Sequence, residues 1–169
     1  LLARYTATNN FYVEGSLRIG SVRTKYNSNA ATLLNAYYDT DNTYYGANFG
    51  IGWIKELKNN ATLEYYGKYF YSYTPSRTIT LTGNNGTEET LDYDAGKSNR
   101  VRVGGRYTFA PEKNSMQNGR FYAGLAYEYE FSGDIVSGWN YATPIPSPST
   151  GGGSGIIEFG WKRLPTLKN

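Results

Sequence analysis

Apolar and polar side chains alternate with a period of two residues along most of this sequence. Between Arg100 and Phe109, one set of alternate positions holds mainly valine, tyrosine and phenylalanine, and the other set holds mainly arginine. Successive side chains of a β-strand point to opposite faces of the sheet, so this pattern predicts strands with one apolar and one polar face. No segment has the apolar spacing of an amphipathic helix. The chain is therefore predicted to be all-β.

The length of the alternating segments narrows the choice of β fold. About seven segments can be recognised, within residues 1–6, 11–20, 44–54, 61–73, 100–109, 120–131 and 155–162. Most contain roughly ten residues or more, which a tilted membrane strand needs, whereas strands of soluble proteins average about 5–6 residues. No apolar run approaches the ~20 residues of a membrane-spanning helix. The segments thus favour a membrane β-barrel.

The connections between these segments alternate in length. Short or moderate connections cover residues 7–10, 55–60 and 110–118, and long ones cover 25–42, 74–96 and 134–151. This asymmetry is typical of outer-membrane barrels. We therefore predict an antiparallel up-and-down meander of an outer-membrane β-barrel, with the three long loops at one end. Within 74–96, Asn84-Asn85-Gly86 predicts a hairpin, and the prolines of 134–151 exclude a central strand there.

A soluble β-sandwich would show the same alternation, with its apolar faces buried against each other. Three features favour the membrane. The strands are long and similar in length, the polar faces combine glycine, tyrosine and charges of both signs, and the apolar faces end in aromatic residues such as Tyr45, Trp53 and Phe131. Aromatic side chains at strand ends suit the two membrane–water interfaces. The alternative is a soluble Tyr/Asn-rich β-sandwich or barrel that binds carbohydrate.

Missing residue types exclude several functions. The chain has no cysteine and no histidine, which removes disulfides, zinc sites of the usual ligand sets and histidine-based acid–base catalysis. The net charge of +3 comes from 17 basic and 14 acidic residues spread along the chain, which argues against a nucleic-acid partner. We expect that the protein is not an enzyme, and that it has no catalytic residue, cofactor or metal site.

Six segments together resemble the C-terminal β-barrel (translocator) domain of autotransporters, also called type V secretion proteins. They are YVEGSLRIG at 12–20, YYGANFGIG at 44–52, LEYYGKYF at 63–70, RVRVGGRYTF at 100–109, FYAGLAYEYEFSG at 121–133 and GGSGIIEFG at 152–160. They occur in the order found in the family, with turns and loops in corresponding places. The resemblance covers nearly the whole chain.

This resemblance implies a twelve-stranded barrel, threaded by a helix, in the outer membrane of a Gram-negative bacterium. It implies export of an N-terminal passenger to the cell surface, with outer-membrane lipid, the passenger polypeptide and the barrel-assembly machinery as partners. The sequence differs from the family in showing about seven strands, no passenger, no clear linker helix and no aromatic residue at its end. Because a starting Met and a signal peptide are also missing, we expect residues 1–169 to be an incomplete part of a single barrel domain.

The charged residues on the polar faces are the candidate functional residues, and we expect them to face the lumen of the barrel. They are Glu14, Arg18, Glu64, Lys68, Arg100, Arg102, Arg106, Arg120, Glu128, Glu130, Glu158 and Lys162. A hairpin centred near Ser115 would place Arg102 opposite Glu128 and Arg100 opposite Glu130. Such charges could hold a plug helix or a passing chain, or could simply pair with each other and fix the strand register. Similarly, Gly104 and Gly124 could leave room in the lumen or mark bends of the strands.

Overall fold

The computed structural model describes residues 1–27, 37–83, 86, 88–109, 119–132, 137–139, 143–145 and 151–163. Every regular element in this part of the chain is a β-strand, and all the strands belong to one antiparallel sheet. These residues include no helix long and apolar enough to cross a membrane. The prediction of an all-β fold is confirmed.

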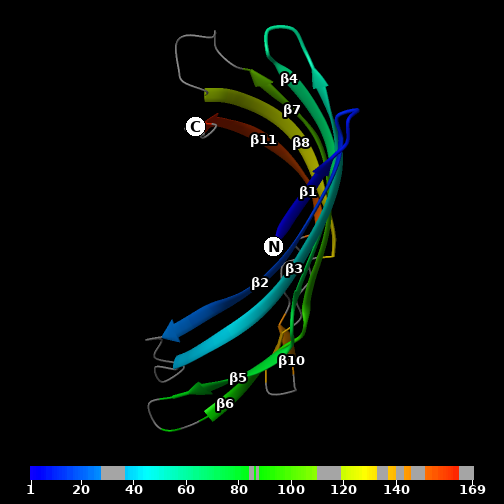
Figure 1. Ribbon diagram of the computed structural model, residues 1–169. Helices are drawn as coiled ribbons and strands as arrows, with labels where there is room; N and C mark the ends of the chain where they lie inside the picture. Colours follow the sequence, from blue (N-terminus) through cyan, green and yellow to red (C-terminus); the bar gives the residue numbers. More distant parts are fainter. Residues whose placement is uncertain are drawn as a thin grey trace.

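Seven strands follow one another as an up-and-down meander. They are β1 (Leu2–Thr6), β2 (Phe11–Asn27), β3 (Tyr37–Glu56), β4 (Thr62–Thr74), β7 (Gly96–Phe109), β8 (Gly119–Ser132) and β11 (Gly152–Arg163). Each strand pairs with the next one in this order, as predicted. The sheet curves into a trough with β1 and β11 at its two edges (Figure 1). In the described residues these edges do not pair with each other, so the sheet is open.

Four short strands extend the sheet. They are β5 (Arg77–Thr82), β6 (Glu88–Tyr93), β9 (Ser137–Trp139) and β10 (Thr143–Ile145). β5 and β6 pair with each other, which confirms the hairpin predicted around Asn84-Asn85-Gly86. β5 meets the start of β3, and β6 continues to β9 and β10. Because β10 ends the strand order, Pro144 lies in an edge strand, where a missing N–H donor is tolerated.

One predicted loop boundary is wrong. β2 continues to Asn27 and β3 already begins at Tyr37, so both ends of the predicted loop 25–42 are strand. The sequence hides this because the alternate positions here carry charged residues, such as Arg23 and Asp39, in place of apolar ones. Residues 28–36, the turn 110–118 and the greater part of 134–151 lie outside the described residues.

The two ends of the trough differ as predicted for the described part of the chain. The hairpin β5–β6 and strand β10 lie at the end where β2 stops and β3 starts (Figure 1). The short connections at 7–10 and 57–61 lie at the opposite end. Since the strands form a meander, each long strand crosses from one end to the other once.

The register gathers the large apolar side chains on one side of the sheet, which we call the apolar face. Val103 pairs with Tyr127, and Leu125 pairs with Ile157. These side chains are uncovered, and Leu125 is 68 % exposed. The register confirms the predicted separation of the two sides. It groups Val101, Val103, Tyr107, Leu125, Tyr127, Phe159 and Trp161 on this side and Arg102, Arg106 and Glu128 on the other, and the side chain of Lys162 lies outside the described part of the chain.

The opposite side, which we call the polar face, is crowded. Glu128 and Glu130 are each only 9 % exposed and Tyr12 is fully buried, although the described residues form no second layer over this face. Side chains converge on the concave side of a curved sheet and spread apart on its convex side. The polar face is therefore the concave surface of the trough, and the apolar face is the convex one.

Strands β5 and β6 reverse this arrangement. Ile79, Leu81 and Leu91 are buried, and the leucines pack against Tyr38 and Tyr93 on the side that carries the polar face in the rest of the sheet. Their alternate neighbours are mainly threonine and acidic residues. Two residues without strand structure separate β4 from β5, and two more separate β6 from β7. These interruptions shift the alternation by one residue, which exchanges the faces.

Candidate functional site

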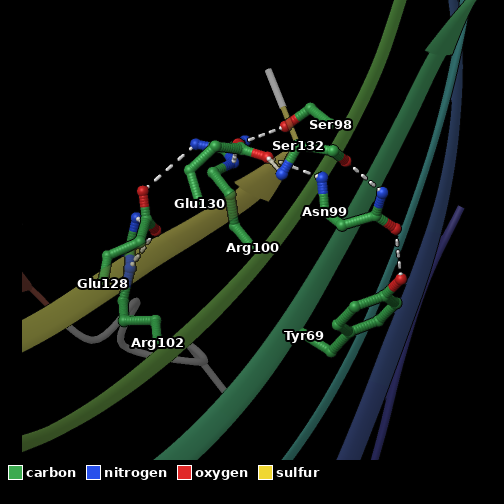
Figure 2. A network of polar contacts seen from close by, with 8 residues as sticks. All are labelled: Tyr69, Ser98, Asn99, Arg100, Arg102, Glu128, Glu130 and Ser132. Carbon is green, nitrogen blue, oxygen red and sulfur yellow. Dashed lines mark hydrogen bonds and ion pairs between the residues drawn. The ribbon is translucent and has the colours of Figure 1, made fainter. Parts of the chain in front are cut away.

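The ion pairs predicted between β7 and β8 form in the structure. Arg102 lies opposite Glu128, and Arg100 lies opposite Glu130. Arg102 donates from Nε to Glu128 Oε2 at 2.8 Å, and its Nη2 lies 2.7 Å from the same oxygen. Arg100 Nη1 is 3.3 Å from Glu128 Oε1, and Arg100 Nε is 3.5 Å from Glu130 Oε2. Both guanidinium groups thus neutralise nearly buried carboxylates (Figure 2).

Glu130 also accepts hydrogen bonds from backbone N–H groups at an irregularity in the pairing of β7 and β8. The register between β7 and β8 shifts between Asn99 and Arg100, where Phe131 of β8 is the extra residue of a β-bulge. Glu130 Oε1 accepts hydrogen bonds from the backbone N–H groups of Asn99, at 2.8 Å, and Ser132, at 3.2 Å. Its Oε2 accepts from Ser98 Oγ at 2.6 Å. The carboxylate therefore satisfies donors that the bulge takes out of the ladder, and Asn99 carries the network on to Tyr69 (Figure 2).

A second group of ion pairs begins at β1. Arg4 lies 3.8 Å from Glu14 and 3.7 Å from Glu64, measured between guanidinium nitrogens and carboxylate oxygens. Glu14 is also paired with Lys68, whose Nζ is 2.6 Å from Oε1. Glu14 and Lys68 belong to β2 and β4, with Gly50 of β3 between them. A Cβ at position 50 would lie 3.0 Å from Glu14 Cγ, so the glycine leaves the path open for this ion pair.

A second ion pair that passes over a glycine of the intervening strand connects β7 to β11. Arg106 of β7 donates to Glu158 Oε2 from Nη2 at 2.6 Å and from Nε at 3.1 Å. Gly124 of β8 lies between these two strands, and a Cβ there would be 3.4 Å from Glu158 Oε2. Arg106 also lies 3.6 Å from Glu64, and Tyr66 donates from its hydroxyl to Glu158 Oε1 at 3.1 Å. Ion pairs thus connect β1 to β11; we call this series the ion-pair ladder. It consists of Arg4, Glu14, Lys68, Glu64, Arg106 and Glu158.

The chemistry available on the polar face is charge neutralisation. Each of its carboxylates, on Glu14, Glu64, Glu128, Glu130 and Glu158, has a cationic nitrogen within 4.0 Å. In the described part of the chain, no group of three or more His, Cys, Asp or Glu residues could hold a metal ion. The face therefore combines charges of both signs that are already matched to one another across the strands.

The comparison with protein families identifies this curved, two-faced sheet. The sequence model of the family described as Autotransporter beta-domain matches residues 1–160. The chain belongs to the autotransporter β-domain family. This membership confirms the resemblance seen in the sequence and assigns the sheet to an outer-membrane β-barrel family with a translocator role. Comparisons with curated proteins and with solved structures gave no match.

Aromatic rings support the cations of this β-domain. Each ring lies on the polar face close to a cationic group, at a distance that allows a cation–π contact. The pairs are Arg4 with Tyr12 at 3.6 Å, Lys68 with Tyr66 at 5.0 Å, Arg100 and Arg102 with Phe70 at 5.6 and 5.1 Å, and Arg106 with Tyr122 at 5.0 Å. These cations of the polar face thus contact both carboxylates and aromatic rings.

The glycines of the β-domain make space for its own side chains. At Gly104 a Cβ would lie 2.8 Å from the ring of Tyr66, and at Gly124 it would approach the Arg106–Glu158 pair. The sequence left open whether these two positions provide room in the lumen or strand bends. The structure shows that the room exists and that neighbouring strands of the same sheet fill it.

The structure places the predicted charged residues as follows. Nine of them belong to the contacts above: Glu14, Glu64, Lys68, Arg100, Arg102, Arg106, Glu128, Glu130 and Glu158. Arg18 and Arg120 lie on the polar face without a carboxylate within 4.0 Å among the described residues, and the backbone of Lys162 pairs with that of Arg120. Sequence reasoning missed Arg4. A hairpin register across residues 7–10 could have found it, since Arg4 lies opposite Glu14.

Proposed function

We propose that this chain forms part of the wall of a β-barrel in the bacterial outer membrane, which anchors a passenger polypeptide and supports its export to the cell surface. Membership of the autotransporter β-domain family supports the export role. One observation carries the membrane position. The convex face exposes large apolar side chains such as Leu125 and Phe159, whereas the concave face buries charged ones such as Glu128.

The free energies of the two faces favour lipid outside and water inside. Removing one large apolar side chain from water stabilises a structure by roughly 1.5–3 kcal/mol. An arginine that faces lipid at the bilayer midplane costs about 2–4 kcal/mol. The convex face carries many exposed apolar side chains, and Arg100, Arg102 and Arg106 lie on the concave face. We therefore assign the convex face to lipid and the concave face to the lumen.

The end of the sheet that carries β5 and β6 extends beyond the bilayer. β3 has 20 residues, whereas a tilted strand crosses the membrane with about 9–11. On the convex side near the start of β3, an ion pair joins Arg23 to Asp39, whose side chains are 60 % and 40 % exposed. Charged residues on this side belong in water. We infer that this end, which carries the long connections, projects from the outer surface of the membrane.

We further propose that the β-domain works without enzyme activity, with lipid, a passenger and the barrel-assembly machinery as its partners. The pairing of the polar-face carboxylates supports this, because general acid–base work needs a carboxylate free to exchange protons with a substrate. A soluble carbohydrate-binding sandwich would need a second sheet against the apolar face, and the described residues supply none.

Membrane fractionation of the full-length gene product tests the proposal. We expect the product in the outer-membrane fraction, released only by detergent, with electrophoretic mobility that changes on heating. Protease added to intact cells should remove a passenger from the surface. Recovery of the product as a soluble monomer without detergent would contradict the membrane assignment, and a passenger protected from protease would contradict the export role.

A further inference from the structure

On the polar face of the described meander strands, all the acidic side chains have ion-pair partners, whereas some of the basic ones do not. Every carboxylate there is paired, and so are Arg4, Lys68, Arg100, Arg102 and Arg106. Among the described residues of the seven meander strands, Arg18 and Arg120 are the polar-face arginines with no carboxylate inside 4.0 Å. Arg77 of the projecting strand β5 also has none, but its guanidinium donates to Thr40 Oγ1 and lies near the ring of Tyr93. The excess charge of this face therefore resides in two arginines that the sequence did not distinguish from the others.

The surroundings of Arg18 are neutral. It lies opposite Gly46, and its Nε is 3.7 Å from the place where a Cβ of that glycine would be. Across Gly46 the next strand presents Ser72, and the strand beyond it presents Ser98. No acidic position of the neighbouring strands stands in the same row. Arg18 is exposed, so its guanidinium is available to a group that enters the trough.

Arg120 occupies the other end of the polar face. It follows Gly119 at the start of β8, next to the short-turn end of the trough, whereas the row of Arg18 crosses β4 at Ser72, close to the residue where β4 ends and a long connection begins. The residue opposite Arg120 on β11 is Lys162, so the register offers it no acidic neighbour there. One uncompensated guanidinium thus lies toward each end of the concave face.

We propose that Arg18 and Arg120 are two anion-binding points of the lumen, which bind carboxylate side chains of the polypeptide that occupies it. This inference rests on the proposed function, because it requires the concave face to line a lumen. The paired arginines contribute little net charge, whereas the two unpaired ones attract anions. A low-dielectric wall around a narrow water-filled space strengthens such attraction.

An acidic peptide tests this directly. The full-length product is reconstituted in planar bilayers, and a short poly-glutamate peptide is added while conductance is recorded. We expect the peptide to block the parent, and the block by a given concentration to weaken by about 2- to 10-fold in the R18Q/R120Q variant, since exposed ion pairs of this kind are individually weak. The matched control is R23Q/K25Q, which removes two cations from the convex side of the projecting end and should leave the block unchanged.

The outcomes separate the two proposals. A parent that neither inserts nor conducts contradicts the proposed function itself. A parent that conducts, but is blocked equally in R18Q/R120Q, overturns the anion-binding inference and leaves the barrel intact. If the double variant loses its heat-dependent mobility, the single variants R18Q and R120Q provide the same measurement. Block that is retained in both overturns the inference, and block that weakens in either supports it.

Discussion

At the scale of single residues, Glu128 carries an unusual share of the contacts on the polar face. It is nearly buried and binds both Arg100 and Arg102. Replacing it by glutamine removes the charge from three short contacts, which leaves Arg102 without a carboxylate partner and Arg100 with Glu130 alone. We expect E128Q to lower the free energy of unfolding by about 1–3 kcal/mol, a range typical of hydrogen bonds to charged groups. Denaturant unfolding of the lipid-embedded barrel measures this.

The control for E128Q is R120Q, which removes a charge of the same face that has no carboxylate partner in the described residues. Its free energy of unfolding should stay within about 0.5 kcal/mol of the parent. Equal stability of E128Q and the parent would contradict a structural role for these ion pairs.

A second residue-scale prediction concerns Asp39, which lies outside the membrane-spanning segments. The hydrogen bond from Arg23 holds the pKa of Asp39 below its ordinary value. A carboxylate with a lowered folded-state pKa contributes stability above its unfolded-state pKa, and the contribution is lost as the pH falls through the folded-state pKa. In R23Q we expect the pKa of Asp39 to rise toward its ordinary value. A carboxyl titration followed by NMR measures this, and an unchanged pKa would contradict the contact.

Sequence reasoning found the pairs between β7 and β8, which are joined by one turn, and failed for pairs that skip a strand. Arg102 and Glu128 could be matched because a single hairpin register sets them opposite each other. Arg106 and Glu158 are 52 residues apart and lie on strands that do not touch. Their contact depends on the missing side chain at Gly124, and a pattern of alternation within one strand carries no information about the strand after next.

At the scale of elements, glycine positions decide how closely neighbouring strands can fit. A Cβ at Gly104 would lie 2.8 Å from the Tyr66 ring and 2.7 Å from the Cβ of Ala126. We expect G104V to displace Tyr66, to break its hydrogen bond to Glu158, and to lower the free energy of unfolding by about 1–3 kcal/mol through overpacking. The control is G67V, since nothing lies within 4 Å of a Cβ at Gly67. G104V as stable as G67V would contradict this account.

The projecting hairpin β5–β6 should behave as a separate packing unit. Leu91 and Leu81 are buried in its small apolar cluster. We expect L91D to loosen this hairpin, because an unpaired charge would then be buried. Limited proteolysis of the reconstituted barrel should cut L91D faster within residues 75–95, with the heat-dependent mobility of the barrel retained. T80D, which places the same charge on the exposed side, serves as the control.

The reversal of faces in β5 and β6 was outside the reach of the sequence analysis. The hairpin itself followed from Asn84-Asn85-Gly86, but the side on which Leu81 and Leu91 lie depends on the short interruptions at 75–76 and 94–95. One residue more or less at such a point exchanges the faces. Alternation shows which side chains of one strand share a face. It does not show whether the apolar residues of the next strand lie on the same side of the sheet.

At the scale of the whole molecule, Arg100, Arg102 and Arg106 neutralise four carboxylates of the concave face. We expect the R100Q/R102Q/R106Q variant to insert as a folded barrel of lower stability, because the arginine side chains are partly exposed but the carboxylates of Glu128 and Glu130 that they neutralise are nearly buried. Its lumen should become more negative, so the reversal potential in a salt gradient should shift toward cation selectivity. A variant that fails to insert would show that these arginines are required for folding, and an unchanged selectivity would place them away from the conducting path.

The strand-skipping ion pairs also bear on the fidelity of assembly. A shift of β8 by two residues against β7 keeps every side chain on the same face of the sheet. It could place Glu130 opposite Arg102 in place of Glu128. Ion pairs between these two strands alone therefore do not exclude the wrong register. The same shift sets Ala126 opposite Arg106 in place of Gly124 and separates Arg106 from Glu158. A contact between the first and third of three strands therefore depends on the register of both strand pairs. The contact between Arg106 and Glu158 forms only when β8 is in register with β7 and β11 is in register with β8, so a register error in either pairing prevents it.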